Sequence, residues 1–145
     1  RLIHDDEAIF HFFQENVFDG LWFWDLEQKE QIYMNDSFWR MLGYKASEMP
    51  HSSSVFEKIL SQEEIQQVIP SLENYIKHPD GIWKGMVQYI HKSGSLVWAK
   101  SKAIAICNSS GKAVKLLGTI TDITEQKKAE QLLKQQNERY LTINE

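Results

Sequence analysis

The stretch from residue 82 to residue 122 constrains the fold most, because its side chains alternate in character with a period of two. Residues 82–91, 95–107 and 113–122 each have the length and the alternation of a β-strand. The two connections, HKSGS at 91–95 and NSSGK at 108–112, are short and contain glycine, as tight hairpin turns require. The three stretches therefore predict an antiparallel meander.

In the middle strand, 95–107, the two alternating sets of side chains differ in size. One set contains only small residues, which are Val97, Ala99, Ser101, Ala103, Ala105 and Cys107. The other set contains larger side chains, among them Leu96, Trp98 and Ile104. If the small set faces the interior, it leaves room that either a ligand or bulky core side chains can fill. Both interpretations stay open at this point.

The N-terminal part of the chain predicts a helix, a hairpin and a second helix. Apolar residues at helical spacing in 5–18 predict an amphipathic helix that packs on the outside of the domain. The segments LWFW at 21–24 and QIYM at 31–34 predict two paired strands. Asn35 begins a run of three good N-cap residue types, and the short helix that follows is expected to end at Gly43.

The stretch 45–79 contains no glycine, and its apolar residues recur at spacings of three and four, which predicts two or three helices. Pro70 lies inside the last of these patterns. A proline there removes a helical hydrogen bond and collides with the carbonyl of Gln66. We therefore expect either a kink or a new helix that begins at Pro70.

Residues 124–145 contain neither glycine nor proline and are rich in Glu, Gln, Lys and Leu, which predicts one helix about 33 Å long. Asp122 and Glu125 resemble a capping box, with Thr124 as a second cap candidate. A seam with 4-3-4-3 spacing indicates the start of a coiled coil; its residues are Ala129, Leu133, Gln136, Tyr140 and Ile143. The alternative is a solvated helix docked on its own domain.

Composition argues against several functional classes. Sixteen basic against 20 acidic residues give a net charge of −4, which disfavours nucleic acid and anionic membranes as partners. The apolar runs are far shorter than the about 20 residues of a membrane span. The single cysteine, Cys107, excludes an internal disulfide and, with the mild acidity, indicates the cytoplasm. Because the chain opens at Arg1, we expect it to be part of a longer protein.

Five short motifs, taken in order, resemble those of bacterial sensory-box PAS domains. They are DGLW at 19–22 with Asp25, Asn35 before the short helix, LGY at 42–44, HKSGS at 91–95 with Trp98, and GTITDITE at 118–125. The resemblance covers residues 8–124. It implies an α+β PAS fold: a five-stranded antiparallel sheet with helices covering one face, plus N-terminal and C-terminal flanking helices. The chain then divides into a flanking helix at 1–18, a PAS sensor domain at 19–124 and a C-terminal signalling helix at 125–145 that starts a coiled-coil linker.

The resemblance also implies a role in signal transduction. Such a module senses a small molecule or a partner and relays a conformational signal through its C-terminal helix to an output domain in cis, of the histidine kinase or diguanylate cyclase type. Asp122, Ile123 and Thr124 look like the D-I-T junction that carries the relay. Such domains usually dimerise, so we expect a homodimer within a bacterial two-component protein. The alternative is a ligand-free dimerisation or protein-interaction module.

The pocket that the resemblance implies lies between the sheet and the helices of residues 35–79. Candidate ligand-pocket residues come from the short helix, the helical insertion and the last strands. They are Phe38, Met41, Leu42, Phe56, Leu60, Leu72, Tyr89, Ala99, Ser101 and Ala103.

No catalytic or metal-binding constellation emerges from the sequence. The five histidines are scattered, and none has another histidine or cysteine at metal-ligand spacing. We therefore expect no metal and no enzymatic activity in this chain. Flavin-binding photosensory members carry Asn-Cys-Arg on a helix, but Cys107 lies on a predicted strand, so flavin is disfavoured. His78 is the one candidate haem ligand, and a histidine at a helix end is more simply explained by the helix dipole, so haem is disfavoured too.

Overall fold

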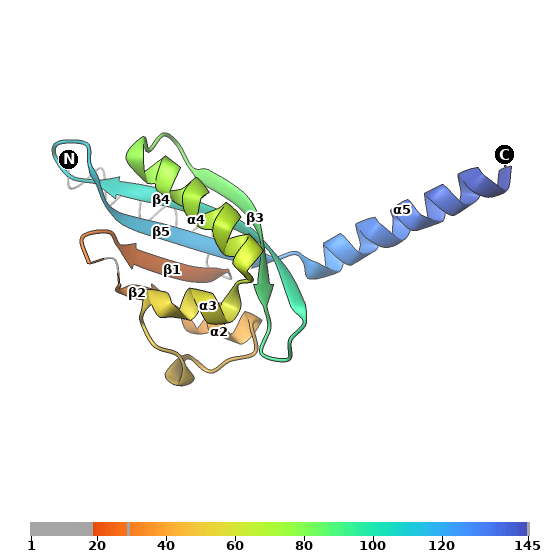
Figure 1. Cartoon of the computed structure of the whole chain (residues 1–145), viewed down its shortest axis with the longest axis horizontal. Helices are drawn as coiled ribbons and strands as arrows, with labels where there is room; N and C mark the ends of the chain where they lie inside the picture. The colour runs from red at the N-terminus through yellow and green to blue at the C-terminus, as the bar shows by residue number, and fades with distance from the viewer. Residues whose placement is uncertain (1–18, 29, 145) are drawn as a thin grey trace.

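A computed structural model describes residues 19–28 and 30–144, so the helix predicted for 5–18 lies outside the described residues. The described chain forms one five-stranded sheet in the order β2-β1-β5-β4-β3 (Figure 1). Every neighbouring pair is antiparallel, as the sequence predicts. The strands are β1 (Gly20–Asp25), β2 (Ile32–Met34), β3 (Trp83–Ile90), β4 (Leu96–Cys107) and β5 (Ala113–Asp122).

The last three strands form the predicted meander, and β5 then pairs with β1. The turns between them contain Gly94 and Gly111, whose φ angles of 95° and 84° explain why glycine is needed there. Because β1 lies beside β5, the first hairpin and the meander share one sheet.

The segment between β2 and β3 supplies the helices that cover one face of this sheet (Figure 1). It contains α2 (Asp36–Met41), two 3-10 turns η1 (Ala46–Glu48) and η2 (Ser53–Val55), then α3 (Phe56–Ile59) and α4 (Gln62–Lys77). Of the three candidate N-cap residues, Asn35 takes this position, because its Oδ1 accepts from the backbone N–H of Phe38 at 2.9 Å. The same oxygen accepts from Leu21 N at 2.9 Å, which fastens α2 to β1.

Helix α4 runs without interruption through Pro70, so the expectation that a new helix begins there is wrong. Pro70 and Gln66 are both exposed. The Gln66 carbonyl that loses its helical donor therefore lies on the solvent side, where water can satisfy it. The helix also has a good start, because Ser61 Oγ accepts from the backbone N–H of Glu64 at 3.2 Å.

The small side chains of β4 face the helices. Ala99 and Ala103 are fully buried and Ser101 is almost fully buried, whereas Lys100 on the opposite face is exposed. Large buried side chains complete the same core, from the neighbouring strand β2 of the sheet and from α2; the most buried of them are Ile32, Met34, Phe38 and Trp39. The interior thus combines small residues on β4 with bulky residues from β2 and α2.

Helix α5 (Thr124–Asn144) leaves the end of β5 and projects away from the domain (Figure 1). The single helix predicted for this region is confirmed. The docked alternative is wrong, because α5 contacts β4 only near its start, and Leu132, Leu133, Tyr140 and Leu141 are each more than half exposed. Within residues 19–28 and 30–144, no helix is both long enough and apolar enough to cross a membrane.

Candidate functional site

A small cavity lies between the inner face of the sheet and helices α3 and α4, and we call it the inner cavity. Its volume is about 30 Å³. Its lining is almost entirely apolar and comes from α2, from α3 and the residue that follows it, from α4 and from the strands. The lining residues are Trp22, Trp24, Met34, Phe38, Phe56, Leu60, Val68, Ile69, Leu72, Trp83, Val87, Tyr89 and Ser101.

The structure brings some of the ten predicted pocket residues to this cavity and leaves others beside it. Those in the lining are Phe38, Phe56, Leu60, Leu72, Tyr89 and Ser101. The remaining four, Met41, Leu42, Ala99 and Ala103, belong to the surrounding core and lie outside the lining. The neighbouring space is filled by larger side chains, so the small residues Ala99 and Ala103 are covered rather than open.

Sequence reasoning missed the contribution of the first hairpin. Trp22, Trp24 and Met34 line the cavity from β1 and β2. The alternation of β2 hinted at an inward Met34, since Tyr33 between its buried neighbours is exposed. In LWFW, by contrast, both alternating sets are apolar, so the pattern could not tell which set faces inward.

The volume limits what this conformation can hold. A space of about 30 Å³ accommodates a guest the size of water, whereas pockets for drug-sized ligands measure roughly 300–1,000 Å³. A flavin or a haem fits only if α3 or α4 moves. His78 is the exposed C-cap residue of α4, and Cys107 ends β4; neither lines the cavity.

Two residues that carry hydroxyl groups belong to the lining of the inner cavity, Tyr89 and Ser101. Burial raises the pKa of the Tyr89 phenol, an effect that the nearby Ser101 hydroxyl partly offsets. Ser101 is 2% exposed, and its Oγ contacts the Tyr89 hydroxyl too loosely to form a hydrogen bond of normal geometry; no other described group bonds to it. A buried hydroxyl without a partner costs about 1–3 kcal/mol. The cavity therefore offers an unused polar contact inside an apolar wall.

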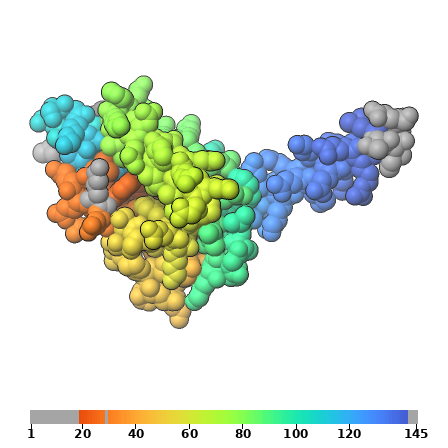
Figure 2. Space-filling view, in the orientation of Figure 1, coloured from red at the N-terminus to blue at the C-terminus, as the bar shows by residue number. Residues whose placement is uncertain are grey.

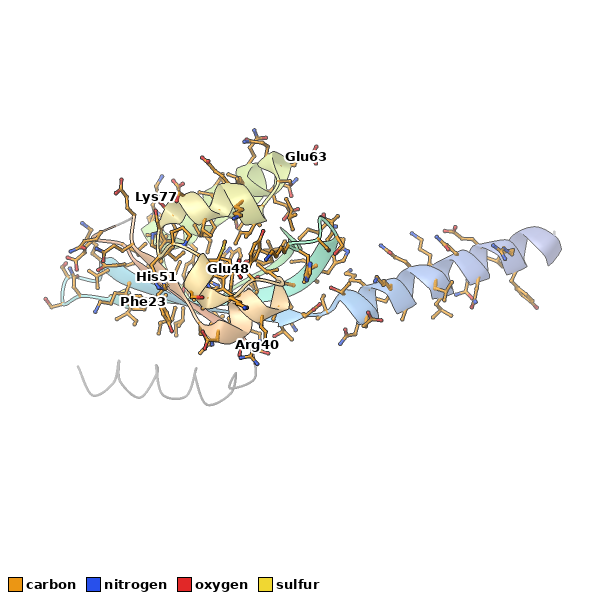
Figure 3. All side chains as sticks on the ribbon, turned by 90° about the horizontal axis from the view of Figure 1, so that it is seen from below. Phe23, Arg40, Glu48, His51, Glu63 and Lys77 are labelled. Carbon is orange, nitrogen blue, oxygen red and sulfur yellow. The ribbon has the colours of Figure 1, made fainter. Side chains whose placement is uncertain are left out.

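Helix α4 is held over the cavity by side-chain hydrogen bonds to the sheet. Glu64 Oε2 accepts from Gln88 N at 3.2 Å, and Ser71 Oγ accepts from Trp83 Nε1 at 3.0 Å. The Tyr75 hydroxyl donates to Gly81 O at 2.8 Å and accepts from Ala105 N at 3.1 Å. These contacts fix the helix at both ends, and Figure 3 labels Glu63 and Lys77 near those ends. The part of the cover that α4 provides is thus anchored to the rest of the domain.

The predicted relay residues Asp122, Ile123 and Thr124 meet at the start of α5. Asp122 Oδ1 accepts from Thr124 N at 2.9 Å and from Thr124 Oγ1 at 2.6 Å, so its carboxylate serves Thr124 rather than a capping box with Glu125. Trp98 adds a partner that the sequence did not reveal. Its backbone N–H donates to Thr124 Oγ1 at 3.1 Å, and its backbone carbonyl accepts from the backbone N–H of Ile123 at 2.9 Å. The backbone of β4 therefore holds the first residues of the helix.

A second contact joins the same strand to the exit helix. The ammonium of Lys127 lies 5.4 Å from the centroid of the Trp98 ring, and it also pairs with Glu130 Oε2 at 3.6 Å. The backbone N–H of Lys127 donates to the backbone carbonyl of Ile123 at 2.9 Å, which closes the first helical turn. Within the described residues, no group of three His, Cys, Asp or Glu side chains could hold a metal ion.

A model of the PAS fold family matches residues 31–120, and the chain belongs to this family. Among solved structures, a sensory box histidine kinase/response regulator from Burkholderia thailandensis E264 superposes with a TM-score of 0.73 at 23% identity, covering 92% of this chain and 98% of that one.

Two further structures show the spread of proteins that share this fold. The N-terminal domain of a diguanylate cyclase with PAS/PAC sensor from Marinobacter aquaeolei has a TM-score of 0.64 at 16% identity, covering 74% of this chain and 97% of that one. A light-oxygen-voltage domain studied with a flavin analogue has a TM-score of 0.64 at 18% identity, covering 90% and 96%. At these identities the likeness is one of fold.

Proposed function

We propose that this chain is a sensory module that couples the state of its inner cavity to the position of α5. The observation that carries the proposal is the double hydrogen bond between the Trp98 backbone and residues 123 and 124. Trp98 lies only three residues from Ser101, which lines the cavity and whose hydroxyl is unpaired. A guest that displaces β4 at Ser101 would therefore move the strand segment on which α5 is fastened.

The coupling needs two arrangements of the strand and the helix. A ligand or partner shifts their populations only if it binds one arrangement more tightly than the other. The unpaired Ser101 Oγ provides such a difference, because a guest with a polar atom satisfies it in one arrangement only. In this proposal the sensed species is a small molecule or a partner rather than a flavin or a haem, and any guest larger than water enters the inner cavity only with a movement of α3 or α4.

The output would lie beyond α5. Neighbours of the same fold come from a histidine kinase/response regulator and from a diguanylate cyclase, which supports an output domain in cis of one of these types. We assign no catalysis to the chain itself, and we place the parent protein in a cytoplasmic bacterial two-component system. Asp122, Ile123 and Thr124 are the relay residues of this proposal.

The experiment is a fusion of residues 1–145 to the catalytic core of a histidine kinase. Thr124→Val removes the hydroxyl that accepts from Trp98 and donates to Asp122 while keeping the side-chain shape. Thr121→Val, on β5 just before the junction, is the matched control. We expect the autophosphorylation rate to change several-fold in the Thr124 variant and to stay near the parent value in the control. Equal autophosphorylation rates in both variants would refute the proposed relay through Thr124.

A second candidate function is a ligand-free dimerisation module. It is favoured by the row of exposed apolar side chains on α5, Leu132, Leu133, Tyr140 and Leu141, which a second copy could bury. Light scattering on the full chain and on a version that stops before Thr124 tests it. A homodimer that needs α5 supports this role for the helix, while a dimer that survives truncation assigns the interface to another surface.

A further inference from the structure

A groove much larger than the inner cavity opens beside it, and we call it the outer groove. Its volume is about 550 Å³, within the range of small-molecule sites. It lies between α4, the start of α3 and the end of β1, and Figure 2 shows the surface hollowed between the green α4 and the orange end of the sheet. Its floor is apolar and is formed by Trp24, Leu26, Phe56, Ile65, Ile69 and Ile76.

The charges around the outer groove are unbalanced. Three carboxylates belong to its lining, those of Glu30, Glu57 and Glu73, and they come from three different segments of the chain. All three side chains are exposed. Among the described lining residues the one cation is Lys77, at the far end of α4 (Figure 3). The described part of the lining thus combines an apolar floor with a negative rim.

The outer groove and the inner cavity share the side chains of Trp24, Phe56 and Ile69. The rings of Trp24 and Phe56 meet edge to face, with centroids 6.1 Å apart. These rings therefore stand between the two spaces, and the unpaired Ser101 hydroxyl lies on the inner side. A guest in the groove would touch the same aromatic wall that closes the cavity.

We propose that the outer groove binds a small organic cation, an amine or quaternary ammonium carried on an aromatic or aliphatic body. The body would lie on Trp24 and Phe56, and the cation would lie next to the carboxylates of Glu57 and Glu73. Aromatic faces attract such cations and the carboxylates neutralise them. An organic anion meets three like charges, and an uncharged guest leaves the carboxylates without a partner.

The inference deepens the proposed sensory function by naming its ligand class. It rests on that function only in the claim that binding produces a signal. Binding itself needs no relay. A metal ion is not the occupant we propose, because the described residues include no group of three metal-ligating side chains and because a metal has no use for an apolar floor. The volume suits one small molecule better than a helix or an extended peptide.

The test titrates 2-phenylethylamine into the full chain and follows the indole N–H signals by NMR. Matched probes are 2-phenylethanol, which is neutral, and 3-phenylpropionate, which is an anion. We expect saturable binding of the amine with a shift of the Trp24 signal, at least about tenfold weaker binding of the alcohol, and no binding of the anion. Raising the salt concentration should weaken the amine complex.

Variants locate the site. Glu57→Gln with Glu73→Gln should weaken binding of the amine by about tenfold or more, since both carboxylates line the groove. Glu63→Gln is the control. Glu63 is an exposed glutamate on α4, as Glu73 is, but its side chain does not belong to the lining of the groove (Figure 3). Unchanged melting temperatures show that each variant is folded.

Equal affinity for the amine and the alcohol, an unaffected double variant, or no binding of the amine would each overturn the proposal. The kinase fusion separates this result from the proposed function. Binding of the amine together with equal rates for the Thr124 and Thr121 variants would sink the relay alone. A working relay without amine binding would sink the organic-cation site alone.

Discussion

Replacing Ser101 by alanine should stabilise the ligand-free protein. The Ser101 hydroxyl is 2% exposed and has no hydrogen-bond partner among the described residues. Most polar-to-apolar substitutions in a core destabilise because they orphan a partner, but here only a loose contact with the Tyr89 hydroxyl is lost. Ser101→Ala therefore removes the cost of a buried unpaired group and leaves the small inward face of β4 otherwise as it is.

The size of the effect follows from two terms. The unpaired hydroxyl costs about 1–3 kcal/mol in the folded state. Removing the oxygen enlarges the cavity by roughly 10 Å³, which at about 24 cal/mol per Å³ costs only about 0.2 kcal/mol. The net gain is about 1 kcal/mol or more, equivalent to a rise in melting temperature of about 3 °C for a chain of this size.

Thermal unfolding followed by circular dichroism measures this change, on protein that has been denatured and refolded so that no guest remains in the cavity. Ser109→Ala, in the exposed turn between β4 and β5, is the control and should change the stability by less than about 0.5 kcal/mol. A fall in melting temperature for Ser101→Ala would refute the reasoning, because it would mean that the hydroxyl is satisfied in the folded protein, by Tyr89 or by an ordered water.

Three further predictions concern the framework of the site. Gly118→Ala places a methyl group against the Trp22 indole, so it should destabilise the domain by about 3 kcal/mol, measured by urea unfolding. Pro70→Ala should stabilise the domain by about 1–2 kcal/mol in the same assay, because α4 regains a backbone hydrogen bond. The greater freedom of the unfolded chain without proline offsets only part of this gain. Burial raises the pKa of Tyr89 above its ordinary 10.0, so the folded protein keeps a proton that the unfolded chain releases, and stability falls as the pH rises above 10. Tyr89→Phe should abolish this part of the loss, and a stability difference between the two proteins that stays constant from pH 8 to pH 11 would contradict it.

The strands and the first helix cap could be predicted from the sequence because their signals are local. Alternation marks the meander, the turn glycines at 94 and 111 need a positive φ, and Asn35 caps the helix that follows it directly. Such features depend on a few consecutive residues. The family resemblance then supplied the expectation of a single five-stranded antiparallel sheet with helices on one face, which no local signal contains.

The site could be predicted only in part, because it is assembled from distant segments. The contact of Trp98 with Thr124 spans 26 residues and depends on the register between β4 and β5. The outer groove joins the end of β1 to α4, and no pattern along the chain shows that Glu30 and Glu73 line the same groove. The course of α4 through Pro70 depends on which side of the helix meets water, and this too is decided by packing.

The central claim is that the inner cavity and the start of α5 are coupled through β4. Amide hydrogen exchange, measured by NMR on the wild type and on Ser101→Val, tests it most directly, because valine fills the cavity with two methyl groups. The reporters are the N–H groups of Ile123 and Lys127 at the root of α5, and the N–H of Leu26, bonded to Val114 O at 3.0 Å near the other end of the sheet, is the reference. The account predicts that protection at Ile123 and Lys127 changes several-fold relative to Leu26. Protection that shifts equally at all three amides, or at none of them, would contradict it.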